Sequence, residues 1–198
     1  RVAITARLVA DFISVAGADR VLTVNLHAGQ IQGFFNIPLD ELDAFPLVAQ
    51  RFGEKRVKDL VVVAPDIGRA KTANDLGALL GAPMAIIQKE RLGNDEKAKA
   101  INLIGDVKGK NTLLVDDEIN TGGTIVAAAE MLIEHGASEV YCCTVHPVFS
   151  GGAPKILSES GIKEVLVTDT LPLADGNVFQ NLSVVSVSSL LGEAIHRI

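Results

Sequence analysis

The chain has 198 residues, of which 48% are hydrophobic and 21% charged, and its formal net charge is −6. This apolar content excludes a disordered chain, the acidic balance argues against nucleic acid as a partner, and no run approaches the roughly 18 apolar residues of a membrane helix. The two cysteines, Cys142 and Cys143, are adjacent, which excludes a disulfide framework or a zinc site by spacing. We therefore expect a cytoplasmic globular protein with one large domain or two small ones.

The chain begins at Arg1 without methionine, already inside a helical pattern, and ends on another helical pattern at Arg197-Ile198. No signal or transit peptide accounts for such a start. We expect this sequence to be a piece of a longer protein.

Apolar segments and helical patterns alternate along the chain. In order, the pattern predicts a helix at 4–16, a strand at 21–24, a helix ending near Gly53, a strand at 60–64, a helix at 69–80 and a strand at 85–87. We predict a charged, mobile loop at 89–99, then a strand at 111–115, a loop at 116–123, a helix at 124–135 and a strand at 140–145. A helix at 153–160, strands at 165–168 and 182–186, and a helix at 188–198 follow. This alternation predicts an α/β fold with a mostly parallel sheet covered on both faces.

The most informative segment is Leu113-Leu-Val-Asp-Asp-Glu-Ile-Asn-Thr-Gly-Gly-Thr124, where a strand ends in two carboxylates before a Thr-Gly-Gly-Thr turn opens a helix. Backbone N–H groups in that turn can form an anion nest at the helix N-terminus, and the glycines let a phosphate approach closely. Asp116 and Asp117 can hold ribose hydroxyls directly or through Mg²⁺. The segment therefore predicts a sugar-phosphate site, and an ordinary strand–turn–helix junction is the alternative.

This acidic pair with its Thr-Gly-Gly-Thr turn resembles the phosphoribosyl-diphosphate loop of the phosphoribosyltransferase fold. The segment Asn25-Leu-His-Ala-Gly-Gln-Ile-Gln-Gly-Phe-Phe35 closely resembles the signature of ribose-phosphate diphosphokinases, also called phosphoribosyl diphosphate synthetases. Three further segments resemble their diphosphate-side loop, the start of their catalytic flexible loop and the lead-in to their sugar-phosphate loop: Ala64–Lys71, Gln88–Arg91 and Gly105–Lys110. The match is colinear over the whole chain, and the sequence is identified as a member of that family with a parallel-sheet, phosphoribosyltransferase-like fold.

The resemblance implies transfer of the diphosphoryl group of Mg-ATP to O1 of ribose 5-phosphate, giving 5-phosphoribosyl 1-diphosphate and AMP for nucleotide biosynthesis. It implies that Lys89 and Arg91 are catalytic and stabilise the transferring β-phosphoryl group. The residues implied to bind ribose 5-phosphate are Asp116, Asp117, Asn120, Thr121, Gly122, Gly123 and Thr124. The residues implied on the diphosphate and ATP side are Asp66, Gly68, Lys71 and His27, with His27 and Asp66 also linked to Mg²⁺.

Several of these residues have simpler interpretations. Lys89 and Arg91 are also typical of a solvated charge run, and Asp66 is also typical of a helix N-cap, a role compatible with ligand binding. We expect Arg69 and Lys71, which follow Asp66, to repel a cation and attract diphosphate.

Amides occupy three positions where the family commonly has acids, namely Asn25, Asn36 and Asn120. These changes put individual metal ligands in question and keep a non-catalytic regulatory paralogue as an alternative. A phosphoribosyltransferase is the other alternative, against which the His27 signature argues.

The resemblance also divides the chain. Residues 1–45 correspond to the C-terminal part of an N-terminal α/β domain, 46–185 to a phosphoribosyltransferase-like domain, and 186–198 to a C-terminal helix packing back toward the first domain. Little of the adenine pocket is then expected in this chain. The implied partners are ATP, ribose 5-phosphate and further copies of the chain in a homo-oligomer, a hexamer by resemblance, without nucleic acid or membrane.

Overall fold

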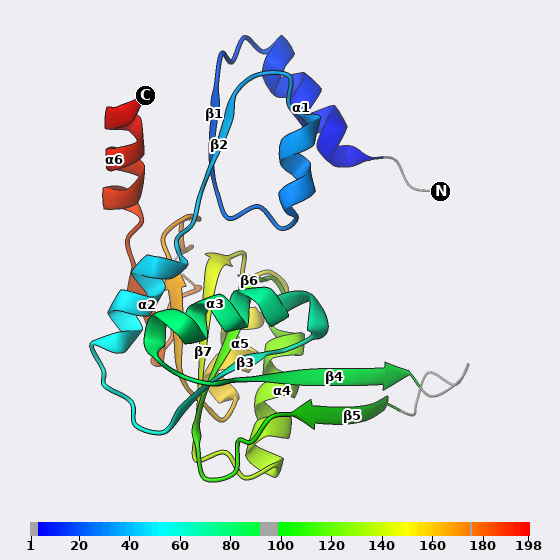
Figure 1. Cartoon of the computed structure of the whole chain (residues 1–198), viewed down its shortest axis with the longest axis vertical. Coiled ribbons are helices and arrows are strands. Elements are labelled where there is room, and N and C mark those ends of the chain that lie inside the picture. Colours follow the sequence, from blue (N-terminus) through cyan, green and yellow to red (C-terminus); the bar gives the residue numbers. More distant parts are fainter. Residues whose placement is uncertain (1–3, 92–98, 175) are drawn as a thin grey trace. The chain divides into compact units, whose positions relative to one another are not determined.

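The computed structural model describes residues 4–91, 99–174 and 176–198. The chain separates into two compact units, Arg1–Ala44 and Phe45–Ile198 (Figure 1). Each unit is built from its own strands and helices and is described by itself.

The first unit holds a helix, two strands and a short 3₁₀ turn. These are α1 at Thr5–Val15, β1 at Val21–Val24, η1 at Gly29–Phe34 and β2 at Leu39–Leu42. β1 and β2 pair in parallel, with Val21 opposite Leu39. The sequence pattern missed β2, because its four residues include two acids and the strand is stabilised by β1, which is distant in the chain.

The second unit contains a seven-stranded sheet and its covering helices. Its elements are α2 at Phe45–Gly53, β3 at Leu60–Ala64, η2 at Ile67–Arg69, α3 at Ala70–Leu80, β4 at Met84–Arg91, β5 at Lys99–Ile104, β6 at Asn111–Ile119, α4 at Gly123–Glu134, β7 at Glu139–Pro147, α5 at Ala153–Glu159, β8 at Ile162–Thr168, β9 at Leu182–Val185 and α6 at Ser188–Arg197. The strand order is β5-β4-β3-β6-β7-β8-β9, and every adjacent pair is parallel except β4 with β5. The predicted α/β fold with a mostly parallel sheet is confirmed. The predicted packing of residues 186–198 toward the first domain stays a prediction.

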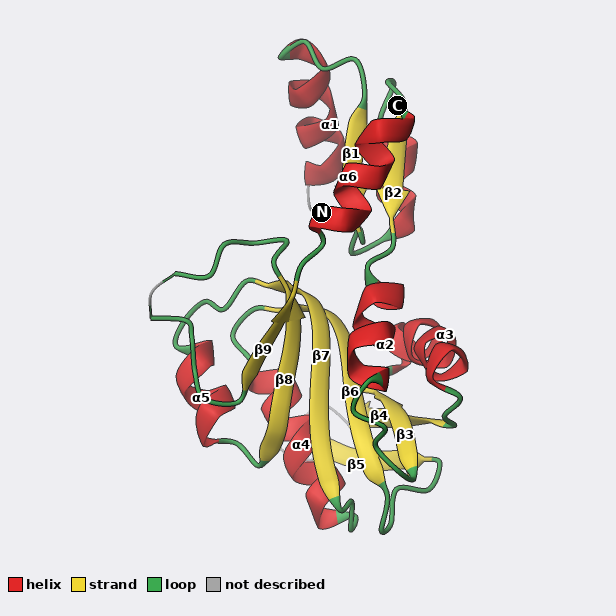
Figure 2. Cartoon of the chain, turned by 90° about the vertical axis from the view of Figure 1, so that its left-hand side faces the viewer, coloured by secondary structure: helices red, strands yellow, loops and turns green. Residues whose placement is uncertain are grey.

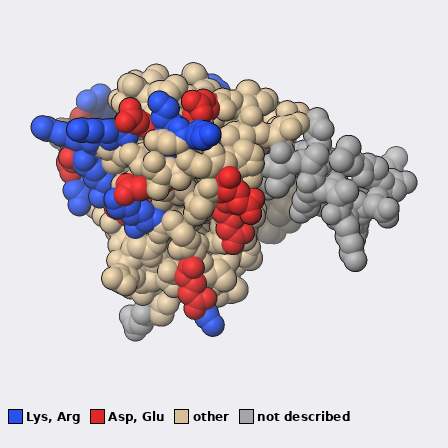
Figure 3. Space-filling view, turned by 90° about the horizontal axis from the view of Figure 1, so that it is seen from below, with Lys and Arg blue, Asp and Glu red and all other residues tan. Residues whose placement is uncertain are grey.

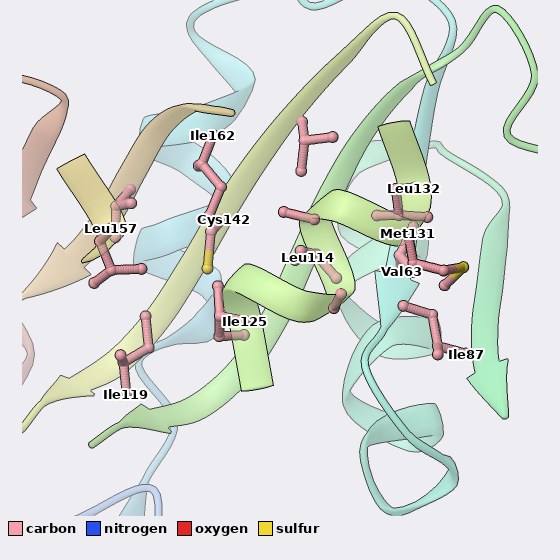
Figure 4. Close-up of a cluster of buried hydrophobic side chains, with 14 of the residues drawn as sticks. Val63, Ile87, Leu114, Ile119, Ile125, Met131, Leu132, Cys142, Leu157 and Ile162 are labelled. Atoms are coloured by element: carbon pink, nitrogen blue, oxygen red, sulfur yellow. The ribbon is translucent and has the colours of Figure 1, made fainter. Parts of the chain in front are cut away.

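Helices cover both faces of this sheet, α2 and α3 on one side and α4 and α5 on the other (Figure 2). A strand between two helical layers has no solvent-facing side, which explains why β3 reads Leu-Val-Val-Val-Ala with four of its five residues buried. Val63, Leu114 and Cys142 are register neighbours on adjacent strands and face α4 together. There they meet Ile125 and Leu132 of α4 in the main apolar cluster (Figure 4). No helix in the described ranges is long and apolar enough to cross a bilayer.

Two segments that we predicted as loops are partly strand. β4 continues to Arg91 and pairs antiparallel with β5, so that Lys89 lies opposite Ile101. The intervening residues 92–98, also within the predicted mobile loop, lie outside the described residues. Likewise β6 does not end at the first acid but runs to Ile119, because the equally long β7 supplies partners, with Asp116 opposite Thr144. Pairing between distant segments decided both extensions.

Candidate functional site

The candidate site lies at the carboxyl ends of β6, the central strand, and its neighbour β3. The chain leaves β3 through α3 toward β4 on one side and leaves β6 through α4 toward β7 on the other. Because α3 and α4 cover opposite faces of the sheet, their entry loops diverge here (Figure 2). Ligands of open α/β sheets bind in the crevice that such diverging loops leave.

The loop after β3 is shaped by Asp66. Its carboxylate oxygen Oδ1 accepts a hydrogen bond from the backbone N–H of Arg69 at 3.2 Å and thereby caps η2, so the N-cap interpretation is confirmed. A methyl group at Gly68 would lie 3.0 Å from the same oxygen, which explains the preference for glycine there. Lys71 does not join this carboxylate; its largely exposed side chain pairs with Asp75 along α3 at 3.1 Å.

The two consecutive acids of β6 meet an arginine from the other loop. Nε of Arg69 lies 3.3 Å from Oδ1 of Asp116, and Nη2 lies 3.0 Å from Oδ2 of Asp117. All three side chains are largely buried, with exposed fractions of 17%, 17% and 6%. The guanidinium of Arg69 bridges the acid pair, and its expected attraction for diphosphate stays a prediction. Sequence reasoning missed this contact, since nothing local to Arg69 indicates its partners.

The environment of Asp116 changes its protonation. Burial, reinforced by the neighbouring Asp117 carboxyl, raises the pKa of Asp116 from 3.8 to about 7. The positive charge of Arg69 opposes the rise without cancelling it, since the guanidinium lies closer to Asp117 than to Asp116. A carboxyl group with this pKa is about half protonated at neutral pH and can accept or donate a hydrogen bond to a hydroxyl.

The turn after β6 presents backbone to solvent. Gly122 is buried with φ +79°, the left-handed conformation that favours glycine, and its carbonyl accepts the N–H of Val126 at 3.0 Å. Thr121, Gly123 and Thr124 are exposed around it, at the start of the 12-residue helix α4. The unpaired N–H groups of a helix's first turn, together with its dipole, favour an anion. This turn can therefore receive a phosphate, and we call residues 120–124 the phosphate loop.

A second loop, residues 149–152, supports the phosphate loop. The N–H of Phe149 donates to the carbonyl of Ile119 at 3.0 Å, and the N–H of Ser150 donates to the carbonyl of Asn120 at 2.9 Å. The Ser150 hydroxyl also donates to the side-chain oxygen Oδ1 of Asn120. Sequence reasoning missed this support, although the Gly151-Gly152 doublet, both with positive φ, was a signal of a special turn.

The amide at Asn25, in the first unit, has a structural explanation. Its side-chain amide donates to Oδ1 of Asp43 at 2.8 Å, and its carbonyl oxygen accepts the N–H of Ala44 at 2.8 Å. An acid at this position would face the Asp43 carboxylate without a proton to donate. His27, two residues on, is exposed between β1 and η1. Nothing in the structure explains the amide at Asn36.

Lys89 and Arg91 lie at the end of β4 by their backbone positions, and their side chains lie outside the described residues. β4 runs parallel to β3, so its carboxyl end lies at the same edge of the sheet. Among the described residues, no group of three or more His, Cys, Asp or Glu side chains is placed to hold a metal ion.

A cavity of about 520 Å³ lies at the opposite edge of the sheet, where β3 and β4 begin. It is lined by Val57, Asp59, Leu60, Val61, Leu80, Gly81, Ala82, Pro83, Met84, Asp106 and Lys110. None of the predicted site residues contributes to this lining, so this cavity is not part of the candidate site. From below, acidic and basic side chains are interspersed over a largely uncharged surface (Figure 3).

The parallel sheet, the open phosphate loop and the buried acid pair at its carboxyl edge define an α/β protein of the phosphoribosyltransferase-like class. Adenine phosphoribosyltransferase from Giardia lamblia shares this fold alone, with a TM-score of 0.51 and 16% identity over 63% of this chain and 77% of its own.

A family profile described as "Phosphoribosyl synthetase-associated domain" matches residues 92–198, and the chain belongs to this family. Among curated relatives, the ribose-phosphate pyrophosphokinases of Caldanaerobacter subterraneus subsp. tengcongensis and Nostoc sp. are 52% and 48% identical, over 98% and 100% of this chain. The chain spans 62% and 60% of their lengths. The crystal structure of phosphoribosylpyrophosphate synthetase from Mycobacterium smegmatis has a TM-score of 0.92 and 44% identity, over 99% of this chain and 64% of its own. The predicted family is confirmed.

Proposed function

We propose that the full-length protein is a ribose-phosphate diphosphokinase, which converts Mg-ATP and ribose 5-phosphate into 5-phosphoribosyl 1-diphosphate and AMP. The observation that carries this proposal is that Arg69, from the Asp66 loop, bridges the acid pair that precedes the phosphate loop at the carboxyl edge of the sheet. The names of the relatives support it. By resemblance, the protein works in the cytoplasm as a homo-oligomer.

In the proposed complex, ribose 5-phosphate lies across the end of β6. Its phosphate accepts hydrogen bonds from the backbone N–H groups and hydroxyls of residues 121–124. Asn120 adds an amide N–H, because its carbonyl oxygen is occupied by the Ser150 hydroxyl. The ribose hydroxyls face Asp116, whose carboxyl can accept a hydrogen bond from a hydroxyl or donate one to it.

The proposed transfer forms a bond between O1 of the ribose and the β-phosphorus of ATP. The bond from the β-phosphorus to the oxygen bridging the α-phosphate breaks, AMP leaves with that oxygen, and the 1-hydroxyl proton is released. Such transfers depend on positioning and charge neutralisation. Lys89 and Arg91 supply positive charge to the β-phosphoryl oxygens, while Asp66, Gly68 and Lys71 serve the diphosphate side. Asp66 would hold the Mg²⁺ that arrives with ATP, and this ion would supply neutralisation of phosphate charge; the link of His27 to Mg-ATP rests on resemblance.

The test is to incubate purified full-length protein with Mg-ATP and ribose 5-phosphate and to measure AMP. AMP that forms only when ribose 5-phosphate is present supports the proposal. Diphosphate release from 5-phosphoribosyl 1-diphosphate that requires a nucleobase would instead indicate a phosphoribosyltransferase. Neither reaction, with retained binding to an active homologue, would indicate a regulatory paralogue.

Variants assign the catalytic role. Lys89→Ala and Arg91→Ala should each lower the rate of AMP formation by about a hundredfold or more and leave ribose 5-phosphate binding within about twofold. Lys58→Ala removes an exposed lysine at the other edge of the sheet and should leave both quantities unchanged. Equal activity of all three variants would contradict the roles of Lys89 and Arg91.

A further inference from the structure

We propose that Arg69 is a positioning residue that sets how the acid pair of β6 presents its oxygens to ribose 5-phosphate. The inference deepens the proposed function and rests on it. Its structural basis is the bridge from the guanidinium to Asp116 at 3.3 Å and to Asp117 at 3.0 Å.

Backbone hydrogen bonds hold Arg69 in place. It is the last residue of η2, and its backbone N–H donates to Oδ1 and to the carbonyl of Asp66, at 3.2 and 3.3 Å. The side chain therefore leaves the diphosphate-side loop from a fixed point and reaches the neighbouring strand β6. Its guanidinium is planar, so two contacts from one plane fix its direction in a way that a lysine ammonium cannot.

Backbone N–H groups also donate hydrogen bonds to the carboxylate oxygens of Asp116 and Asp117. Oδ1 of Asp116 accepts the N–H of Asp117 at 2.9 Å in addition to its contact with Arg69. In Asp117, Oδ1 accepts the N–H of Glu118 at 3.0 Å and Oδ2 contacts Arg69.

These contacts assign different tasks to the two acids. Asp116 turns Oδ1 toward the Asp117 backbone and Arg69, and, as the more exposed acid of the pair, it meets the ribose hydroxyls. Asp117, the more deeply buried of the two, anchors Arg69. The arginine also offsets part of the repulsion between two adjacent buried carboxylates, which would otherwise rotate apart or take up a proton. Arg69 thus acts on the substrate through the acids.

The test compares Arg69→Ala and Arg69→Lys with the wild-type full-length protein. We expect the alanine variant to raise the KM for ribose 5-phosphate by about tenfold and to weaken ribose 5-phosphate binding equally in calorimetry without ATP. The KM for ATP should change less than about twofold. Arg69→Lys keeps the positive charge but cannot contact Asp116 and Asp117 through one planar group. It should therefore still raise the KM for ribose 5-phosphate several-fold. A purely structural role would lower the active fraction and kcat and leave KM unchanged.

Two controls sharpen the comparison. Arg51→Ala removes another guanidinium, one that pairs with Glu54 on the surface at 2.6 Å, and should leave every constant within about twofold. In the double variant Arg69→Ala/Asp117→Asn, the loss of affinity should not exceed the larger single loss by more than about twofold, since the two residues act as one unit. Independent, multiplied losses would overturn the anchoring role of Asp117.

The inference is overturned if folded Arg69→Ala binds ribose 5-phosphate like the wild type, or if Arg69→Lys does so. Should the alanine variant not fold, the lysine variant decides alone. A wild-type protein that neither binds ribose 5-phosphate nor forms AMP would overturn the proposed function. Wild-type activity with unchanged Arg69 variants would overturn the inference alone.

Discussion

Replacing Asp116 with asparagine should change how the stability of the protein depends on pH. Burial and the adjacent Asp117 raise the pKa of the Asp116 carboxyl from 3.8 to about 7 in the folded protein. The folded state therefore holds this proton more tightly than the unfolded state does. As the pH rises from about 4 to about 7, the unfolded state loses the proton first, and the free energy of unfolding falls.

The size of the effect follows from the two pKa values. A difference of about 3 units corresponds to about 4 kcal/mol at about 1.4 kcal/mol per unit. Applying the linkage relation at each pH places about 3 kcal/mol of this loss between pH 5 and pH 8. Asparagine keeps the shape of the side chain and has no proton to lose. The free energy of unfolding of Asp116→Asn should therefore rise by about 3 kcal/mol relative to that of the wild type between pH 5 and pH 8.

The assay is urea unfolding at pH 5, 6, 7 and 8. Because the chain has no tryptophan and one tyrosine, far-ultraviolet circular dichroism is the suitable signal. Asp75→Asn is the matched control; its side chain is 56% exposed, so its effect should stay within about 0.5 kcal/mol at every pH. A gap between wild type and Asp116→Asn that stays constant from pH 5 to pH 8 would refute the reasoning.

Three further predictions concern stability, thiol chemistry and the phosphate loop. Gly105→Ala should destabilise the protein by about 3 kcal/mol, because φ is +112° and the new methyl would lie 2.7 Å from the nearest side-chain carbon of β4. Gly109→Ala, with φ +68° and open space, should cost about 1 kcal/mol in the same urea titration, and equal losses would contradict the steric argument. Cys142 and Cys143 are fully buried, and burial raises the pKa of both thiols, so an aromatic disulfide reagent should label them only as fast as the protein unfolds; rapid labelling of native protein would disagree. Ser150→Ala should weaken ribose 5-phosphate binding several-fold in calorimetry by releasing the amide of the phosphate loop, and unchanged affinity would argue against that support.

Local sequence patterns predicted most of the sheet. Leu60–Ala64 is a continuous apolar run, and such runs mark strands buried on both faces whatever their partners are. Where strands depend on pairing, the prediction failed. Leu39–Leu42 is short and acidic, and the outer end of β4 is charged, yet parallel β1 and antiparallel β5 supply their backbone hydrogen bonds.

The candidate site shows the same division. The acid pair and the phosphate loop were predictable because their residues follow one another closely in the sequence. The spacing of residues 116–124 is typical of a sugar-phosphate site. The support from Ser150 and the bridge from Arg69 were not, because these residues reach their partners only after β3, β6 and β7 lie side by side. Apart from the glycine doublet at 151–152, no local signal pointed to either contact.

The sequence alone therefore determined the fold class and the family, and it predicted the segments proposed to bind phosphate, since each rests on short-range pattern and composition. Only the tertiary structure decided that Asp116 is buried with a raised pKa, that Asp117 holds Arg69, and that Asn120 has its carbonyl oxygen taken by Ser150. Burial and ion pairing depend on distances between segments far apart in the chain. Those distances exist only once the sheet has formed.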